Sequence, residues 1–217
     1  MRYQNTVKAT FIDRPNRFIA HVELDGHVET VHVKNTGRCK ELLLPGVTVI
    51  LEDVNTPNRK TRYDLIAVYK ENFGLINIDS QAPNKVAMEW LFEMGYSLIR
   101  PEYTYGESRI DFYLEDGTQK ILMEVKGCTL ERGGIGYFPD APTERGVKHL
   151  RELIKAKKEG YQSILCFVVQ MENIYEVRPN VTTHKEFGDV FDEARAAGVE
   201  VLILPCQVTE DSLTALF

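Results

Sequence analysis

Two acidic residues and a lysine near the middle of the chain have the types and spacing that metal-dependent phosphodiester chemistry requires. Asp111 precedes Glu124, and Lys126 follows Glu124 after one intervening residue. Carboxylate oxygens suit Mg²⁺ or Mn²⁺, which keep bound waters and can lower the pKa of such a water. A nearby ammonium group can orient that water or stabilise the phosphate oxygens. These residues therefore predict a divalent-metal site that hydrolyses phosphodiester bonds.

The pattern around these residues predicts two neighbouring strands, at 109–114 and 121–126. Strand alternation directs Asp111 to one face of the first strand, and Glu124 and Lys126 to one face of the second. The three residues match the PD-(D/E)xK nuclease pattern, but the spacing alone is a weak signal, because acidic residues and lysines are common on strand edges. The helix and strand signals before and after the hairpin strengthen it. The alternative without a functional role is a solvated β-hairpin with a cross-strand salt bridge.

The connection between the strands decides whether the two acidic faces coincide. A loop that spans residues 116–119 places Asp111 directly opposite Glu124. A two-residue loop at Asp116-Gly117 makes them diagonal neighbours on the same face. A three-residue loop would separate them onto opposite faces.

Two further ligands could complete the metal site. The backbone carbonyl of Val125 lies between the two key residues of the second strand. Glu89 lies on the helix predicted before the hairpin, although a solvated side chain is about equally expected there.

Basic residues in both halves of the chain could bind phosphate. The candidates for contact with nucleic acid are Arg38, Arg59, Lys60, Arg62, Arg109 and Arg145. The alternative for Arg109 is an ion pair with Asp111, and for the others it is ordinary surface charge. Arg145 begins a helix, whose N-terminus attracts anions. His149, one turn later, is expected at the surface or behind the metal ligands.

The same basic track could include Arg14 and Lys34 in the first half of the chain. Phe11, Phe18 and Tyr63 could stack on bases, since small β-barrels use aromatic side chains in this way. The alternative is a stable barrel with core aromatics.

Short strands predict a small barrel in the first part of the chain. They are expected at 7–13, 18–24, 27–34, 47–52, 63–71 and 75–78. Asp25-Gly26 is a strong signal for a tight hairpin between the second and third strands. Five or so short strands in this length favour an OB-fold-like nucleic-acid-binding domain over residues 1–82.

The pattern changes from residue 83 on, where helices alternate with strands. Asn84 is predicted to cap a helix that Gly95 ends, and Thr143 to cap a second one. Between the hairpin and Thr143 the Gly-rich segment 127–142 is expected to be a loop, whose residues 133–138 could form a lid. Residues 83–217 therefore predict an α/β domain of the nuclease type, and the whole chain a mixed α/β fold.

The composition and charge of the chain are typical of a globular protein and argue against a membrane or secreted protein. The 217 residues are 43% hydrophobic and carry a net charge of −6, which argues against nonspecific coating of nucleic acid. Residues 1–80 hold 11 Lys/Arg and 10 Asp/Glu, whereas the rest hold 15 and 22. The four cysteines form no CxxC pair, no apolar run is long enough for a membrane span, and no signal peptide is evident. We expect a cytoplasmic protein; a homo-oligomer is compatible with this sequence, which does not reveal the oligomeric state.

Four stretches resemble the sugar fermentation stimulation protein family (SfsA). They are Lys34-Asn35-Thr36-Gly37-Arg38-Cys39, Tyr105-Gly106-Glu107-Ser108-Arg109-Ile110-Asp111-Phe112, Met123-Glu124-Val125-Lys126-Gly127 and Phe138-Pro139-Asp140-Ala141-Pro142-Thr143-Glu144-Arg145-Gly146. The resemblance covers essentially the whole chain. It implies an N-terminal OB-fold, a C-terminal nuclease-like domain, DNA binding and a regulatory role in sugar metabolism, but no established reaction.

Two main hypotheses follow. The first is a nuclease that uses Mg²⁺ or Mn²⁺ to cleave DNA, or else RNA. Asp111 and Glu124 would hold the metal, and Lys126 would position the water. The rival is a DNA-binding regulator of sugar metabolism that keeps the nuclease fold without turnover. A metal-binding scaffold for a protein partner has no sequence feature of its own.

Overall fold

The computed structural model describes residues 1–57 and 59–216, which form two units. The first unit contains the chain up to Ala82, Gln170–Asn173 and the residues from Pro205 on. The second contains Pro83–Val169 and Ile174–Leu204. The predicted domains, 1–82 and 83–217, are contiguous, whereas two later segments join the first unit in the structure.

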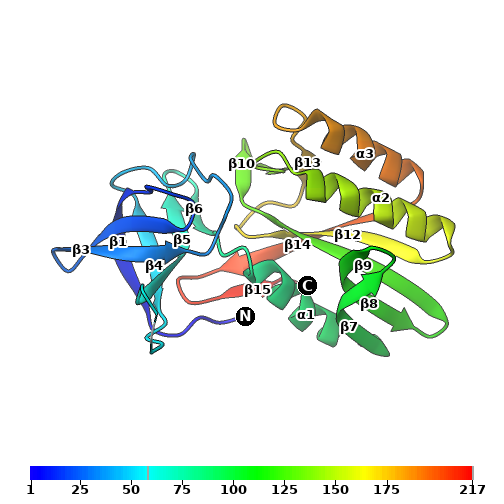
Figure 1. The fold of residues 1–217 in the computed structure, drawn as a ribbon, viewed down its shortest axis with the longest axis horizontal. Coiled ribbons are helices and arrows are strands. Elements are labelled where there is room, and N and C mark those ends of the chain that lie inside the picture. The colour runs from blue at the N-terminus through cyan, green and yellow to red at the C-terminus, as the bar shows by residue number, and fades with distance from the viewer. Residues whose placement is uncertain (58, 217) are drawn as a thin grey trace. The chain divides into compact units, whose positions relative to one another are not determined.

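The first unit is a β-barrel (Figure 1). Its strands are β1 (Thr6–Asp13), β2 (Ile19–Leu24), β3 (His27–Val33), β4 (Thr48–Asp53), β5 (Tyr63–Lys70) and β6 (Gly74–Asn77). They follow the order β3-β2-β1-β4-β5-β6, and β3 also pairs in parallel with β5. That second pairing closes β1 to β5 into a barrel, as predicted.

The β2–β3 hairpin shows why these residues form this barrel. Leu24 pairs with His27, so Asp25 and Gly26 form a two-residue turn with φ of 53° and 79°. Asn, Asp and Gly tolerate this left-handed conformation best, which makes the pair a hairpin signal. Inward-facing Val22 and Val31 are completely buried, as alternation requires.

In the second unit, which contains the helices, the strands of the main sheet follow the order β14-β12-β9-β8-β7. Strand β14 continues past Leu204 and pairs with β15, and these last residues are assigned to the first unit. Strands β7, β8 and β9 are antiparallel, whereas β12 runs parallel to β9. Helices α2 and α3 lie side by side over the sheet (Figure 1). The elements are α1 (Ala82–Met94), β7 (Leu98–Tyr105), β8 (Ser108–Asp116), β9 (Gln119–Cys128), β10 (Leu130–Arg132), β11 (Ile135–Phe138), α2 (Glu144–Lys158), β12 (Gln162–Val169), β13 (Val177–Pro179), α3 (Lys185–Ala196), β14 (Glu200–Val208) and β15 (Leu213–Ala215).

The prediction for the Gly-rich segment was wrong. Its central part forms the antiparallel strands β10 and β11, and β11 pairs in parallel with β13. Gly133 and Gly134 make the turn, with φ of 60° and 81°. A Cβ on Gly136 would lie 3.0 Å from Cys128 Sγ, so close packing explains this glycine. The segment is therefore part of a small sheet rather than an unpaired lid.

The predicted cap of α1 was also wrong. The helix begins at Ala82, and the N–H of Gln81 donates to Asp79 Oδ1 at 2.8 Å. Asn84 therefore lies in the first turn, where its side chain serves a different purpose. Thr143, by contrast, caps α2 as predicted, since its hydroxyl accepts from the N–H of Gly146 at 3.0 Å. No helix in the described part of the chain is long and apolar enough to cross a membrane.

Candidate metal centre

The β8–β9 hairpin brings Asp111 and Glu124 together. Asp116 pairs with Gln119 and Phe112 with Met123, so the next step of the same register sets Asp111 opposite Glu124. This is the first of the three predicted alternatives. The turn residue Gly117 has φ of 57°, which a glycine adopts without strain. Turn geometry thus decides that both carboxylates share one face.

Both carboxylate oxygens of Asp111 accept hydrogen bonds. Asn84 Nδ2 donates to Oδ1 at 2.8 Å, and the backbone N–H of Val125 donates to Oδ2 at 2.8 Å. Burial raises the pKa of Asp111, and the charge of Glu124 raises it further. The two hydrogen bonds and Lys126 lower it only in part, so the net pKa lies above the usual aspartate value. A bound cation would relieve this unfavourable ionisation.

Glu124 is 1% exposed. Its Oε1 accepts from Lys126 Nζ at 2.6 Å and also contacts His149 Nδ1. Burial alone would raise the pKa of Glu124, but the hydrogen bond from His149 and the charge of Lys126 outweigh it, and the net pKa is lowered. Oε2 is buried and has no hydrogen-bond partner among the described residues. A buried carboxylate oxygen without a partner is costly unless a ligand satisfies it.

Helix α2 supplies His149, which was expected either at the surface or behind the metal ligands, and the structure shows the second position. His149 is 5% exposed, and its Nε2 lies 3.3 Å from Arg145 Nε, one turn earlier. The sequence places His149 on this helix, six residues after the cap at Thr143. The contact with Glu124 was not, because these residues are 25 positions apart.

The donor set fits a hard divalent cation. Asp111 and Glu124 offer carboxylate oxygens, and one of these oxygens is orphaned inside the protein. The arrangement contains no thiolate, and His149 is occupied by its own hydrogen bonds. Oxygen ligands of this kind select Mg²⁺, Mn²⁺ or Ca²⁺ over softer metals.

The other predicted metal ligands lie differently. Glu89 is exposed on α1, and a helix turns by about 140° between positions 84 and 89. Asn84 faces Asp111, so Glu89 lies well around the helix from that contact. Val125 contributes its N–H to Asp111, and ligation by its carbonyl stays a prediction.

Arg109 does not pair with Asp111. Its Nη1 lies 3.4 Å from Glu102 Oε2, and its side chain is 66% exposed. Arg109 therefore remains accessible beside Asp111, two residues along β8. Arg145 is likewise exposed, at the first turn of α2.

In the first unit, the predicted basic track is largely neutralised. Arg59 pairs with the buried carboxylate of Asp64, and Arg62 pairs with Asp53 through Nε at 2.9 Å. Asn58, which precedes Arg59 in the chain, lies outside the described residues. Lys60 is exposed.

Arg14 and Lys34 serve the fold instead of the surface. Arg14 donates to four carbonyls, those of Arg17, Asn35, Gly37 and Arg38. Lys34 pairs with the completely buried Asp79 at 2.9 Å. Because its own side chain is exposed, Arg38 remains a candidate for contact with phosphate.

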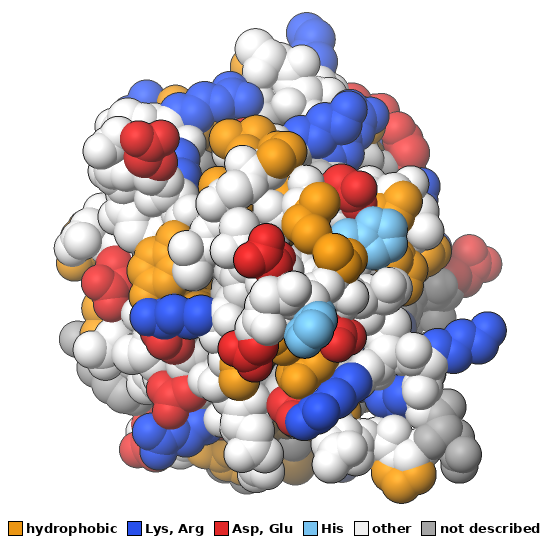
Figure 2. All heavy atoms as spheres, turned by 90° about the vertical axis from the view of Figure 1, so that its left-hand side faces the viewer, with side chains coloured by type: hydrophobic (Ala, Val, Ile, Leu, Met, Phe, Trp, Pro, Cys, Tyr) orange, Lys and Arg blue, Asp and Glu red, His pale blue; other side chains and the backbone are white. Residues whose placement is uncertain are grey.

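The three candidate stacking residues separate by burial. Phe11 and Tyr63 are 2% and 8% exposed and belong to the core, whereas Phe18 is 51% exposed. Acidic and basic side chains are interspersed on the face of this unit shown in Figure 2. Charge alone therefore does not define a nucleic-acid track.

A second group of metal-ligand side chains lies where α2 and α3 begin. Ligand atoms of Glu144, His184 and Glu186 all lie within 4.8 Å of one another. However, His184 Nδ1 accepts from the N–H of Thr143 at 3.3 Å, and Arg151 holds Glu186 at 2.7 Å. A neutral histidine that accepts at Nδ1 carries its proton on Nε2, which opposes metal binding there.

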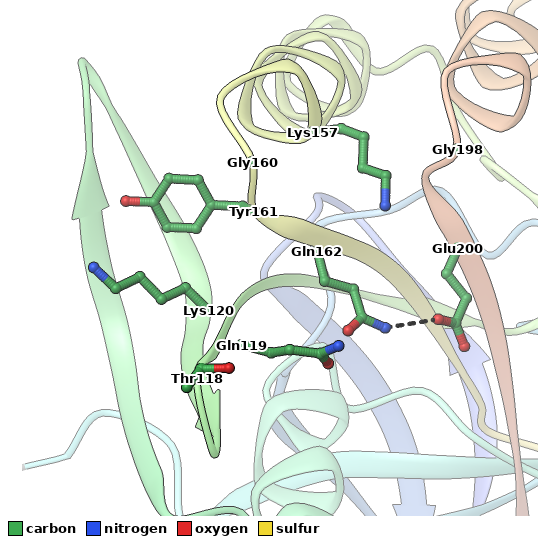
Figure 3. A pocket seen from close by; sticks show the side chains of 9 residues that line it. All are labelled: Thr118, Gln119, Lys120, Lys157, Gly160, Tyr161, Gln162, Gly198 and Glu200. Carbon is green, nitrogen blue, oxygen red and sulfur yellow. Dashed lines mark hydrogen bonds between the residues drawn. The ribbon is translucent and has the colours of Figure 1, made fainter.

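A pocket of about 540 Å³ lies where strands β9, β12 and β14 begin, away from the candidate metal centre. Its lining includes the first residues of β9, β12 and β14, which are Gln119, Gln162 and Glu200. Gln162 donates to Glu200, and Lys157 points toward them (Figure 3). Since Gln119 lies five residues before Glu124, about 16 Å along the strand, this pocket is separate from the candidate metal centre.

Both halves of the chain match sequence models of one protein family. The sequence model described as "Sugar fermentation stimulation protein RE domain" matches residues 81–212, and "SfsA N-terminal OB domain" matches 12–78. The chain is 56% identical to a sugar fermentation stimulation protein homolog of Desulfitobacterium hafniense, over 99% of this chain and 95% of that protein. It is 54% identical to the homolog of Clostridium beijerinckii, over 98% and 96%.

One solved structure is similar over nearly the whole chain. It is that of Pyrococcus furiosus SfsA in complex with Ca²⁺, with a TM-score of 0.86 and 27% identity. The match covers 99% of this chain and 95% of that one.

Proposed function

The chain belongs to the sugar fermentation stimulation protein family, and we propose that its second unit is a metal-dependent nuclease that hydrolyses phosphodiester bonds in DNA. The observation that carries this proposal is the convergence of Asp111 and Glu124 on one face, with Glu124 Oε2 buried and unpartnered. A cation would compensate the negative charge of this pair and would give Glu124 Oε2 a partner.

Asp111 and Glu124 would hold Mg²⁺ or Mn²⁺. Such an ion lowers the pKa of a bound water and neutralises charge on the phosphate. Lys126 Nζ lies 2.6 Å from Glu124 Oε1 and has three N–H donors, so it can also orient the water or a phosphate oxygen. Arg109, exposed beside Asp111, would bind an adjacent phosphate.

The related Pyrococcus furiosus protein supports an oxygen-preferring ion, because its structure was determined in complex with Ca²⁺. Ca²⁺ and Mg²⁺ share hard oxygen ligands but differ in size and coordination number. The smaller ion, with its strict geometry, is the better candidate for turnover here.

The first unit would gather the substrate strand. Arg38, Lys60 and Phe18 are its accessible candidates, since Arg59 and Arg62 are paired with carboxylates. Phe18 could stack on a base, and Arg38 could contact a phosphate. DNA is the proposed partner, and RNA is the alternative that the assay below distinguishes.

The rival proposal is a DNA-binding regulator without turnover. The pairing of Glu124 with both Lys126 and His149 favours it, because the ammonium group and the hydrogen bond from His149 already stabilise the carboxylate without a metal. Such a protein would keep the fold and bind DNA without cleaving it.

One assay separates the two. The full chain would be incubated with single-stranded DNA, duplex DNA and RNA, each with Mg²⁺, Mn²⁺ or EDTA. A nuclease cleaves at least one substrate with metal only, and Asp111→Asn and Lys126→Met reduce cleavage by at least about 100-fold. Asp116→Asn, an exposed carboxylate on the same strand, is the matched control and should cleave normally.

Cleavage that persists unchanged in Asp111→Asn would refute the proposed site. Salt-sensitive DNA binding without cleavage in any metal, unaffected by Asp111→Asn, would favour the regulator.

A further inference from the structure

His149 lies within the candidate metal centre, yet its hydrogen bonds leave it no role as a ligand. Nδ1 contacts Glu124 Oε1, and Nε2 faces Arg145 Nε at 3.3 Å. His149 is 5% exposed, so its ring is enclosed by protein atoms and not by solvent. Lys126 Nζ lies 3.2 Å from Nδ1 and donates to the same Glu124 oxygen.

The neighbours assign the proton on the ring. A guanidinium group only donates hydrogen bonds, so Nε2 of His149 must accept from Arg145. In a neutral imidazole the proton then lies on Nδ1, which donates it to Glu124 Oε1. Lys126 Nζ, which also only donates, therefore gives its hydrogen bond to the same Glu124 oxygen at 2.6 Å and none to Nδ1 at 3.2 Å. Neither nitrogen retains a lone pair for a metal ion.

We propose that His149 is a positioning residue, and that Arg145 and His149 together orient Glu124 for metal binding. Arg145 sets the tautomer of His149, and His149 with Lys126 anchors Oε1 of Glu124. The carboxylate then cannot rotate freely, and Oε2 is presented as the ligand atom. The inference rests on the proposed metal site and assigns Arg145 a role through His149 rather than through phosphate.

Two amide substitutions separate the two ends of the imidazole. Asn places its amide nitrogen as many bonds from Cβ as Nδ1 is, so His149→Asn keeps a donor to Glu124. Gln reaches the place of Nε2, so His149→Gln keeps a partner for Arg145 but loses the donor to Glu124. A residue needed only for packing would not discriminate between them in this direction.

The test measures Mn²⁺ binding to the full chain by titration calorimetry, without reference to activity. Removal of groups that orient metal ligands typically weakens metal binding 10- to 100-fold. We expect His149→Gln to weaken the Asp111-dependent Mn²⁺ site by about 10-fold or more, and His149→Asn by less than about 3-fold. Arg145→Ala, at an exposed position, should weaken it by a few-fold. His27→Gln, an exposed histidine of the first unit, is the control.

Equal losses in His149→Asn and His149→Gln, or no loss in His149→Gln, would overturn the positioning role. Unchanged affinity in Arg145→Ala would remove Arg145 from it. Thermal unfolding of each variant in EDTA identifies any variant that does not fold. Arg145→Ala, at an exposed position, tests the same Arg145–His149–Glu124 contacts without altering a buried residue. If the parent chain binds no Mn²⁺, or if Asp111→Asn binds it unchanged, the proposed function fails. Parent binding that Asp111→Asn abolishes, with normal affinity in His149→Gln, refutes only this inference.

Discussion

The side-chain amide of Asn84, in the first turn of α1, donates to Oδ1 of Asp111 on β8 at 2.8 Å. This contact ties the candidate metal centre to a helix that begins 29 residues earlier in the chain. Asp111 is also half-buried and lies next to Glu124, and both effects raise its pKa by more than the hydrogen bond from Asn84 lowers it. The metal-free protein therefore contains a carboxylate in an unfavourable place.

Asp111→Asn should stabilise the metal-free protein near neutral pH. The folded-state pKa of Asp111 is raised, so the folded protein binds more protons than the unfolded chain in the range above the ordinary aspartate pKa. Stability consequently falls as pH rises through that range, and the amide removes this loss. Asn84 can turn its carbonyl toward the new amide.

Thermal unfolding in EDTA from pH 4 to pH 8 measures this effect. The melting temperature of Asp111→Asn should exceed that of the parent by an amount that grows with pH. Each kcal/mol corresponds to about 2–4 °C in a chain of this size. Added Mn²⁺ should raise the melting temperature of the parent only. A lower melting temperature for the variant at pH 7 in EDTA would contradict the raised pKa.

Arg59→Ala should act on stability more than on nucleic-acid binding. Asp64 is 5% exposed, and the substitution removes the guanidinium partner; among the described residues, His32 at 3.1 Å is then its remaining ion-pair partner. An under-paired buried carboxylate costs about 1–3 kcal/mol. Urea unfolding measures the loss, and Lys60→Ala, an exposed neighbour, should change stability little. Unchanged stability with a large loss of DNA affinity would restore Arg59 to the basic track.

Thr143→Ala should destabilise the protein by about 1 kcal/mol, because it removes the N-cap of α2. Thr143→Ser keeps a hydroxyl acceptor and should lose much less. Urea midpoints of the two variants, measured side by side, provide the comparison. Identical midpoints would show that the hydrogen bond to Gly146 contributes nothing measurable.

The four cysteines should resist thiol reagents in the folded state. Cys39, Cys128, Cys166 and Cys206 are all buried thiols that form no disulfide with one another. Burial raises the pKa of Cys128 and of Cys206 to about 12, so little reactive thiolate forms at pH 8. A chromogenic disulfide reagent should modify these thiols slowly in buffer and rapidly in denaturant. Fast reaction of one thiol in buffer would identify a locally open segment.

Much of the architecture follows from local signals. The Asp25-Gly26 turn, the strand alternation around Asp111 and Glu124, and the Thr143 cap each depend on residues within a few positions. Backbone sterics, side-chain period and capping act over this range, so the barrel, the hairpin and α2 could be predicted. The family resemblance carried the same information over the whole chain.

Tertiary structure alone decided the partners of the polar side chains. The sequence allowed three hairpin registers, and the two-residue turn that pairs Asp116 with Gln119 selected one. It also left open whether His149 would lie at the surface or behind the metal ligands, and it did not predict that β11 would pair with β13 some 40 residues later. These contacts join segments that are far apart in the chain. Their free energy depends on burial and geometry that exist only once both segments are folded, so residue type and spacing could not predict them.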